Sequence, residues 1–404
     1  MKESTLMAGT SVADITPPLE VGLLTSAVKG LYAPFESVRL PLKARVLVLK
    51  SGNELVAVVT LDLLSLNDTS VGGWETFKQE VSDVIPAERI IICCTHTHTA
   101  PESAALTGLY LTKPYQIWLT QVQLRIKEAI NEAIRTVRYC SLSVSISNLE
   151  GFSMQRRIKT PSGIVLSDSV QPIATDILNL PPVDRRVVSL HFHDTNGIGI
   201  AVVVHAVCHA VHEMCMPHVS SEFPGEMCKE LEMSSKNGMA MFLNGAAGDT
   251  NPPTVSMGPE YSRRHGLALA YLARKAENQY QVESSLFSFA KRNVQMSIRS
   301  ESNVTNELDA MARLNAIRIG SLAILFLPGE PFVEIALEIE EASPFEHTIV
   351  VGYSENNIGY ITTEEAFIQG GYEIGPGKWS CLEKGADKVI YANALQLLEE
   401  LYNN

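Results

Sequence analysis

The most constraining feature of the sequence is a set of short apolar runs, each of which ends abruptly in polar residues. Residues 89–94, 198–204 and 322–327 are runs of this kind. Apolar runs of this length are typical of strands with both faces buried, because ordinary helices are longer. The sequence therefore predicts a sheet covered by other elements, with polar side chains at the strand ends.

Two pairs of strands are predicted to form hairpins. Residues 45–49 and 55–63 are strand-like and are separated by a Ser-Gly-Asn turn signal. Residues 187–192 and 198–204 are separated by a turn that contains Asn-Gly, which is a strong hairpin signal. Antiparallel strand pairs are therefore expected at two places in the sheet.

Helical periods alternate with these strands. Trp74, Phe77, Val81 and Val84 are spaced as one face of a helix, which is expected to end before Pro86. Further helices are predicted over residues 119–137, 263–276 and 388–401. No repeat and no Pro/Gly/Ser-rich linker divides the chain. We therefore predict a single domain over residues 1–404, of α/β class, with helices layered on a mixed sheet.

The charge balance argues against one large class of function. The 404-residue chain has 32 Lys and Arg residues against 45 Asp and Glu residues, which gives a net charge of −13. Proteins that bind nucleic acids usually carry a basic surplus or a basic stripe. We therefore expect a small-molecule substrate and no nucleic-acid partner. The sequence does not indicate an oligomeric state.

Three features bear on the location of the protein. The longest apolar stretch, residues 198–211, contains two histidines and is shorter than the ~20 residues of a membrane-spanning helix, so no membrane insertion is expected. The N-terminal residues lack the sustained apolar segment of a signal peptide. The seven cysteines form no Cys-x-x-Cys pair, which favours buried thiols in a reducing compartment. A cytoplasmic location is the resulting expectation.

Most of the histidines fall in two windows of the sequence, residues 96–98 and 191–218. His96 and His98 directly follow a predicted strand, and residues i and i+2 of an extended backbone point to the same side. Both imidazoles are therefore expected to face one site at a strand end, where α/β sheets usually bind ligands. The alternative is a pair of polar residues in a surface loop.

The second window follows the strand over residues 198–204 and contains His205, His209, His212 and His218. Imidazoles at the end of so apolar a run are expected to be buried, and they then need polar partners or a metal. Their spacing matches neither His-Glu-x-x-His nor His-x-x-Glu-His. At least two of the four are expected to be structural or on the surface.

Four residues outside these windows are further candidates. Glu330 follows a predicted strand after a Pro-Gly turn, and a solvated loop carboxylate is the alternative. Tyr360 is a candidate only in combination with others, because a packed tyrosine is the common case. Arg156 and Arg157 are candidates to bind an acidic group of a substrate, and the alternative is a solvated basic pair.

Taken in order, several segments resemble the catalytic domain of the neutral/alkaline, non-lysosomal ceramidase family. They are Ala13-Asp14-Ile15-Thr16-Pro17-Pro18, Leu61-Asp62-Leu63-Leu64, Thr95-His96-Thr97-His98-Thr99-Ala100-Pro101, Cys208-His209, Ser221-Glu222-Phe223-Pro224-Gly225, residues 244–252, residues 327–330, residues 359–363 and Tyr372-Glu373. Together they cover most of the chain. The resemblance implies a ceramidase-like catalytic domain without a counterpart of the family's C-terminal immunoglobulin-like domain.

The resemblance also implies a single zinc ion with four protein ligands. On this chain the ligand positions fall on His96, His209, Glu330 and Tyr360. The family's histidine that contacts the reacting carbonyl falls on His98, so His98 and Tyr360 are the expected catalytic residues. His205 is the alternative to His209, because the residue after His209 departs from the family pattern.

One further position departs from the family. The serine of the family's Gly-Asp-x-Ser-Pro motif, often assigned as the nucleophile, aligns with Asn251 in this chain. A covalent step on a serine is therefore not expected, and direct attack by zinc-activated water is favoured. Asn251 is a candidate to hydrogen-bond the substrate, and the alternative is a turn residue before Pro252.

The predicted function is a zinc-dependent hydrolysis of an amide-type C–N bond in a small molecule. The same metal site would also support ester or lactone cleavage, or amide-forming cyclisation in a biosynthetic pathway. A non-catalytic binding protein with the same fold is a third possibility. The sequence does not name the substrate, and it leaves open whether ceramide is accepted.

Overall fold

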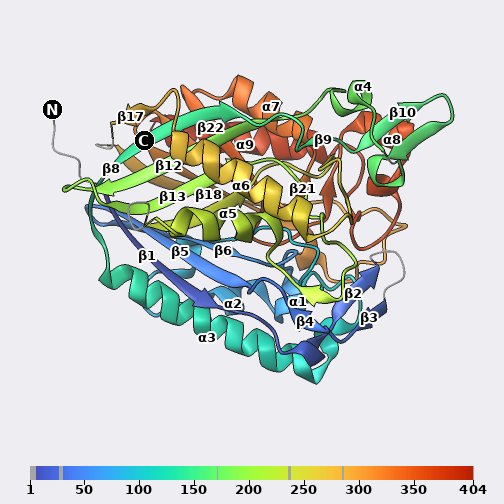
Figure 1. The fold of residues 1–404 in the computed structure, drawn as a ribbon, viewed down its shortest axis with the longest axis horizontal. Helices are drawn as coiled ribbons and strands as arrows, with labels where there is room; N and C mark the ends of the chain where they lie inside the picture. Colours follow the sequence, from blue (N-terminus) through green and yellow to red (C-terminus); the bar gives the residue numbers. More distant parts are fainter. Residues whose placement is uncertain (1–5, 27–30, 171, 235–237, 284–285, 404) are drawn as a thin grey trace.

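A computed structural model describes residues 6–26, 31–170, 172–234, 238–283 and 286–403, and its central element is a 13-stranded sheet (Figure 1). The strand order is β15 (Met239–Asn244), β13 (Gly199–Ala206), β12 (Arg186–Asp194), β8 (Arg138–Asn148), β1 (Leu6–Asp14), β5 (Lys43–Ser51), β6 (Glu54–Leu61), β7 (Ile90–Cys94), β22 (His347–Ser354), β20 (Leu322–Pro328), β19 (Met311–Ile319) and β18 (Phe287–Gln295). Strand β17 (Tyr280–Val282) pairs with β8 outside this order. The predicted α/β class is confirmed.

The sheet is mixed, as predicted. Pairs β6–β7, β13–β15 and β20–β22 are parallel, and the other neighbours in this order are antiparallel. The two predicted hairpins are confirmed as β5–β6 and β12–β13. Gly52 and Gly197 at their turns have φ values of 58° and 76°, which glycine adopts without steric cost.

The sheet curls so that one of its faces encloses an apolar core. In β5, Val46 and Val48 belong to the core under one helical layer, whereas Leu47 and Leu49 belong to the core between the two halves of the sheet. Just after β15, Gly245 bridges Val351 in β22 and so brings the two halves together. Because both faces of these strands are buried, residues in the middle of the strands are apolar on both sides of the sheet.

Helices cover the outer faces of the curled sheet (Figure 1). The longer ones are α3 (Lys113–Arg135) on β1 and β5, α5 (Glu222–Glu232) with α6 (Pro259–Lys275) on the β12–β13–β15 side, and α7 (Val333–Ala342) with α9 (Ala386–Asn403) on the β18–β22 side. The predicted helices over 119–137, 263–276 and 388–401 are confirmed as α3, α6 and α9, although α3 ends at Arg135 and α6 at Lys275. Within the described ranges, no helix is long and apolar enough to span a bilayer.

The remaining elements are short. They include α1 (Asp68–Val71), α2 (Trp74–Glu80), α4 (Thr175–Leu178), α8 (Glu364–Gln369), and the strand pairs β2 (Leu23–Ser26) with β3 (Leu31–Ala33), β4 (Ser37–Val38) with β14 (His218–Val219), β9 (Met154–Gln155) with β16 (Thr250–Asn251), β10 (Arg157–Thr160) with β11 (Gly163–Leu166), and β21 (Glu330–Pro331) with β23 (Tyr360–Ile361). Pairs β9–β16 and β21–β23 carry candidate site residues.

The helix predicted from Trp74 to Val84 is shorter than its apolar period suggests. It ends at Glu80, and Val84 is exposed whereas Ile85 is buried. The hydroxyl of Ser82 accepts hydrogen bonds from the backbone N–H groups of Val84 and Ile85 at 3.1 and 2.9 Å. Side-chain bonding therefore replaces a further helical turn.

A buried ion pair fastens α2 to the segment that follows β22. Nζ of Lys78 lies 2.8 Å from Oε2 of Glu355, and both side chains are buried. The same carboxylate accepts hydrogen bonds from the indole N–H of Trp74 at 2.9 Å and from the backbone N–H of Ile92 at 3.1 Å. One carboxylate thus links α2, β7 and the segment after β22.

We expect Lys78→Met to lower the free energy of unfolding by about 3–5 kcal/mol, because it leaves a buried carboxylate without its counter-charge. Urea denaturation measures this change. The matched control is Lys127→Met, since Lys127 pairs at 2.7 Å with Asp83 at the surface and its loss should cost no more than about 1 kcal/mol. Equal effects of the two substitutions would contradict a structural role for the buried pair.

Candidate metal centre

The candidate residues lie in loops that follow strands of the sheet. His96 and His98 follow β7, His209 follows β13, Glu330 follows β20, and Tyr360 lies beyond the end of β22. These strands are far apart in the sequence. The curl of the sheet brings their ends to one place.

His96, His98 and His209 form a cluster. One ring nitrogen of each lies within 4.8 Å of those of the others. The ring centroid of His96 is 4.8 Å from that of His98 and 4.7 Å from that of His209. His96 and His209 are buried, and His98 is half-buried. Such a group of imidazoles can bind a metal ion.

Glu330 adjoins this cluster. Its Oε2 lies 3.2 Å from Nε2 of His96 and 3.2 Å from Nε2 of His209. Among the described residues, neither Nε2 of His209 nor Oε2 of Glu330 has a partner in hydrogen-bond geometry, although both atoms are buried. Burying polar atoms without partners costs free energy. A metal ion between these atoms would satisfy them.

Backbone carbonyl groups orient the two imidazoles that face Glu330. Nδ1 of His96 lies 2.8 Å from the carbonyl oxygen of Leu64, and Nδ1 of His209 lies 3.2 Å from that of Thr250. A carbonyl oxygen only accepts, so each Nδ1 carries the proton and donates it. The lone pair of each ring is left on Nε2, as in histidines that bind a metal through that atom.

The charge states fit the same arrangement. Burial lowers the pKa of His209 to about 4. Burial, followed by the neighbouring His96, lowers the pKa of His98 well below its usual value. Burial raises the pKa of Glu330, but His96 and His209 outweigh it and hold this pKa well below the usual value. Imidazoles beside an ionised carboxylate are a donor set that zinc favours.

His98 differs from the other two histidines in how its ring is held. Its Nε2 lies 3.2 Å from Nε2 of His96. Since Nε2 of His96 keeps its lone pair, Nε2 of His98 carries the proton and donates to it. No backbone carbonyl within the described part of the chain accepts a hydrogen bond from the His98 ring. The N–H of His98 therefore points toward the ring of His96 in the cluster.

The two imidazoles of the His-x-His pair face one site, but an extended backbone is not the reason. His96 has a φ of 65°, in the left-handed region that residues other than glycine rarely adopt. Its backbone N–H donates to the carbonyl of Leu63 at 3.0 Å, and that of His98 donates to the carbonyl of Ala210 at 3.1 Å. Neighbouring loops thus hold a strained turn, which is common at functional sites.

His205, the alternative to His209, lies outside the cluster. It belongs to β13 itself, and its Nε2 donates to the carbonyl of Val350 in β22 at 3.0 Å. His212 pairs instead with His265, with ring nitrogens 3.0 Å apart, and His218 lies 2.7 Å from a carboxylate oxygen of Glu213. These positions agree with the expectation that at least two of the four histidines have structural roles.

Tyr360 lies directly opposite Glu330. Strands β21 and β23 are parallel and pair these two residues in register. The buried hydroxyl of Tyr360 accepts a hydrogen bond from Nη2 of Arg156 at 3.1 Å. Burial raises the pKa of Tyr360 well above its usual value, while the guanidinium of Arg156 acts in the opposite direction. A phenol here becomes an oxygen ligand when a cation favours its phenolate.

Arg156 and Arg157 are buried and share one carboxylate. Oε1 of Glu373 accepts a hydrogen bond from Nε of Arg156 at 3.0 Å, and its Oε2 accepts one from Nη1 of Arg157. A solvated basic pair is therefore excluded. Arg156 reaches the centre through Tyr360, whereas Arg157 turns toward the carbonyl of Gly370 at 2.6 Å. The structure does not bring Arg157 to the histidines.

Asn251 lies in β16, next to the residue whose carbonyl holds His209. It is buried, and its Oδ1 has no hydrogen-bond partner among the described residues. Because β16 pairs with β9, the alternative of a plain turn residue is wrong. A buried amide oxygen without a protein partner is available to a donor on a bound molecule.

Several contributors to the centre carry no signal in the sequence. The ring of Tyr353 stacks on His96 with centroids 4.0 Å apart, and its buried hydroxyl has no partner among the described residues. Leu64 and Thr250 contribute only backbone carbonyl groups, which every residue has. A tyrosine in an apolar run is typical of a core. Glu373 could have been identified from the sequence, because it belongs to a segment of the family resemblance.

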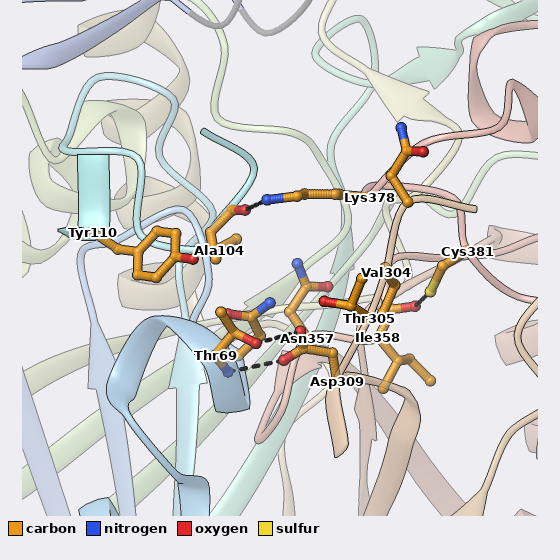
Figure 2. A pocket seen from close by; sticks show the side chains of 13 residues that line it. Thr69, Ala104, Tyr110, Val304, Thr305, Asp309, Asn357, Ile358, Lys378 and Cys381 are labelled. Carbon is orange, nitrogen blue, oxygen red and sulfur yellow. Dashed lines mark hydrogen bonds between the residues drawn. The ribbon is translucent and has the colours of Figure 1, made fainter. Parts of the chain in front are cut away.

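Two small cavities lie near the histidine loop. One, of about 20 Å³, is lined by Leu64, Thr97, His98, Ala100, Glu102, Met214 and Cys215. The other, of about 70 Å³, is shown in Figure 2. There Thr69 bonds Asp309 through its backbone N–H and its hydroxyl, and Nζ of Lys378 donates to the carbonyl of Ala105 at 2.8 Å. Since His98 lines the first cavity only, that cavity adjoins the cluster.

Comparisons with known proteins identify the fold. No protein-family model and no curated protein matches the chain by sequence. The crystal structure of neutral ceramidase from Pseudomonas aeruginosa matches with a TM-score of 0.77 and 17% identity, over 100% of this chain and 75% of the ceramidase chain. A structure of a ceramidase complexed with C2 matches with a TM-score of 0.79 and 17% identity, over 99% and 76%. The chain thus has the ceramidase fold along its length, as the motifs predicted.

We expect Tyr353→Phe to raise the free energy of unfolding of the metal-free protein by about 1 kcal/mol, because it removes an unpartnered buried hydroxyl and keeps the ring on His96. Tyr360→Phe is the matched control. It should lower the free energy of unfolding by about 1 kcal/mol, since Arg156 loses an acceptor. Urea denaturation after chelation measures both. Destabilisation by Tyr353→Phe would mean that its hydroxyl has a partner in the folded protein.

Proposed function

We propose that the chain is a zinc-dependent hydrolase of the neutral ceramidase family that cleaves an amide-type C–N bond in a small molecule. The observation that carries the proposal is the approach of Oε2 of Glu330 to within 3.2 Å of Nε2 of both His96 and His209. Both imidazole tautomers are set for metal binding by backbone carbonyl groups. The ceramidase fold supports amide chemistry.

Four residues would hold the zinc ion in this proposal: His96, His209, Glu330 and Tyr360. They offer two nitrogen and two oxygen atoms, a set that zinc accepts. The unpartnered buried atoms of His209 and Glu330 are those that such an ion would satisfy. When bound, zinc supplies a Lewis acid that makes water a nucleophile near neutral pH.

The remaining residues of the centre would bind and orient the amide. The N–H of His98 donates a hydrogen bond to the substrate carbonyl oxygen, where negative charge develops during the reaction. Oδ1 of Asn251 accepts a hydrogen bond from the substrate N–H. Arg156, which pairs with Glu373, keeps the hydroxyl of Tyr360 in place.

Water is the attacking group in the proposed reaction. Asn251 stands where the resemblance would place a nucleophilic serine, and a carboxamide does not attack a carbonyl. Water adds to the carbonyl carbon, the C–N bond breaks, and the products are a carboxylic acid and an amine. The cavity of about 20 Å³ beside His98 is of the size that holds one water, which favours substrates with a small group at this position.

Replacement of His96 and of His98 should separate metal binding from catalysis. Elemental analysis of the purified protein should find about one zinc ion per chain. His96→Ala should lose the zinc because it removes a ligand. His98→Ala should keep the zinc and lower kcat on a cleaved amide by about 10²–10³-fold, because it removes a donor to the carbonyl oxygen. Equal zinc loss in both variants would refute this division of roles.

His209 and His205 are separated by the same metal analysis. His209→Ala should lose zinc, whereas His205→Ala should keep it, because the ring of His205 donates to Val350 outside the cluster. Circular dichroism of both variants checks that they are folded. Zinc loss in His205→Ala alone would move the ligand assignment to the alternative histidine.

The reaction class is tested with an amide and an ester of the same small acid, with products identified by mass spectrometry. Turnover of the amide supports the proposal. Turnover of the ester alone would mean ester or lactone cleavage, and formation of a new amide would mean a cyclising or biosynthetic enzyme. Absence of turnover with zinc bound would indicate a binding protein.

A further inference from the structure

A single buried carboxyl group joins the two loops that carry the histidines. It belongs to Glu222, the first residue of α5, whose exposed fraction is 0%. The backbone of Glu222 has a φ of 51°, in the left-handed region that is unfavourable for a residue with a Cβ. The proposed chemistry gives this residue no part.

The first contact of this carboxyl group is to the loop over residues 95–99. Oε1 of Glu222 accepts a hydrogen bond from the hydroxyl of Thr99 at 3.2 Å, and Thr99 directly follows His98. Ser220, two residues before Glu222, bonds the same loop. Its backbone N–H donates to the carbonyl of Thr99 at 2.8 Å, and its carbonyl accepts from the hydroxyl of Thr97 at 2.8 Å.

The second contact is to the loop over residues 207–213. Oε2 of Glu222 accepts a hydrogen bond from the backbone N–H of His212 at 3.0 Å, and its Oε1 accepts one from that of Glu213 at 2.9 Å. These N–H groups lie shortly after His209 in the chain. One carboxyl group thus serves two backbone donors of one histidine loop and a hydroxyl of the other.

Further buried charges surround this link. The carboxylate of Glu213 pairs with Arg39 and with His218, and Arg39 also lies 2.7 Å from Glu226. Burial, followed by the nearby Glu213, raises the pKa of Glu222 above its usual value. Burying a carboxyl group on a strained backbone lowers the stability of the fold. Residues with strained backbones or shifted pKa values are concentrated at functional sites.

We propose that Glu222 is a positioning residue of the metal centre. Its carboxyl group sets the placement of the loop over 95–99 relative to the loop over 207–213, and thereby the approach of His96 to His209. Glu222 touches neither the metal ligands nor the cavity at His98. The inference rests on the proposed zinc function, so its test includes a measurement without metal.

Three variants isolate this role. Glu222→Gln keeps the size of the side chain but replaces one accepting oxygen with an NH₂ group, which cannot accept from a backbone N–H. Thr99→Val removes only the hydroxyl link to the first loop. Glu226→Gln is the matched control, because it alters a buried carboxyl group one turn along α5 whose ion-pair partner is Arg39.

Zinc affinity is measured by competition with a chromophoric chelator, and the visible spectrum of the cobalt-loaded protein reports the ligand geometry. Glu222→Gln and Thr99→Val should each weaken zinc binding about 10-fold or more and alter the cobalt spectrum. Glu226→Gln should bind zinc like the wild type. Wild-type affinity in both test variants, or an equal loss in the control, would overturn the proposal.

Hydrogen exchange in the metal-free protein separates this inference from the proposed function. Glu222→Gln should speed exchange in peptides that cover residues 95–99 and 207–213, and Glu226→Gln should not. If the wild type binds no zinc, the proposed function fails, yet faster exchange confined to these two loops would still support Glu222 as their link. Unchanged exchange in both loops would refute it.

Discussion

The hydrogen bonds from Nδ1 of His96 and His209 to backbone carbonyl groups are what the rest of the centre depends on. Without them, either ring could turn an N–H toward Glu330 and form an ordinary charged pair. With them, both rings present a lone pair to the same carboxylate. The two carbonyl groups belong to Leu64 after β6 and to Thr250 in β16, so the ring orientations depend on how the sheet curls.

A series of polar contacts runs outward from this centre. The Glu330 carboxylate faces Tyr360, Tyr360 accepts from Arg156, and Arg156 shares Glu373 with Arg157. The two buried guanidinium groups therefore share one buried counter-charge, and a dry interior needs such pairing. The arginines that a sequence alone suggests for substrate binding are already paired with one carboxylate of the protein. Arg156 contacts the centre through the phenol of Tyr360.

The sequence was sufficient to predict those elements whose structure is determined by a local pattern of residues. Strands β5, β6, β7, β13 and β20 were predictable because both of their faces are buried, and the hairpins because their turns contain glycine. The end of α2 was not, because a hydroxyl of Ser82 takes over backbone bonding there. His96 and His98 were found by position, although the premise of an extended backbone was wrong. Glu330 and Tyr360 were predicted as ligands only through the family resemblance. The pairing of strands that are distant in the sequence cannot be recognised from a local pattern.

The wide spacing of the candidate ligands, from residue 96 to residue 360, has a consequence for how the protein matures. Their donor atoms meet only after loops of great length have closed, and such closures carry a large entropic cost and slow folding. A growing polypeptide on the ribosome therefore offers no complete chelate until the last of these segments has emerged. Metal would then be acquired as a late step, and it would stabilise the finished chain rather than guide its earlier collapse.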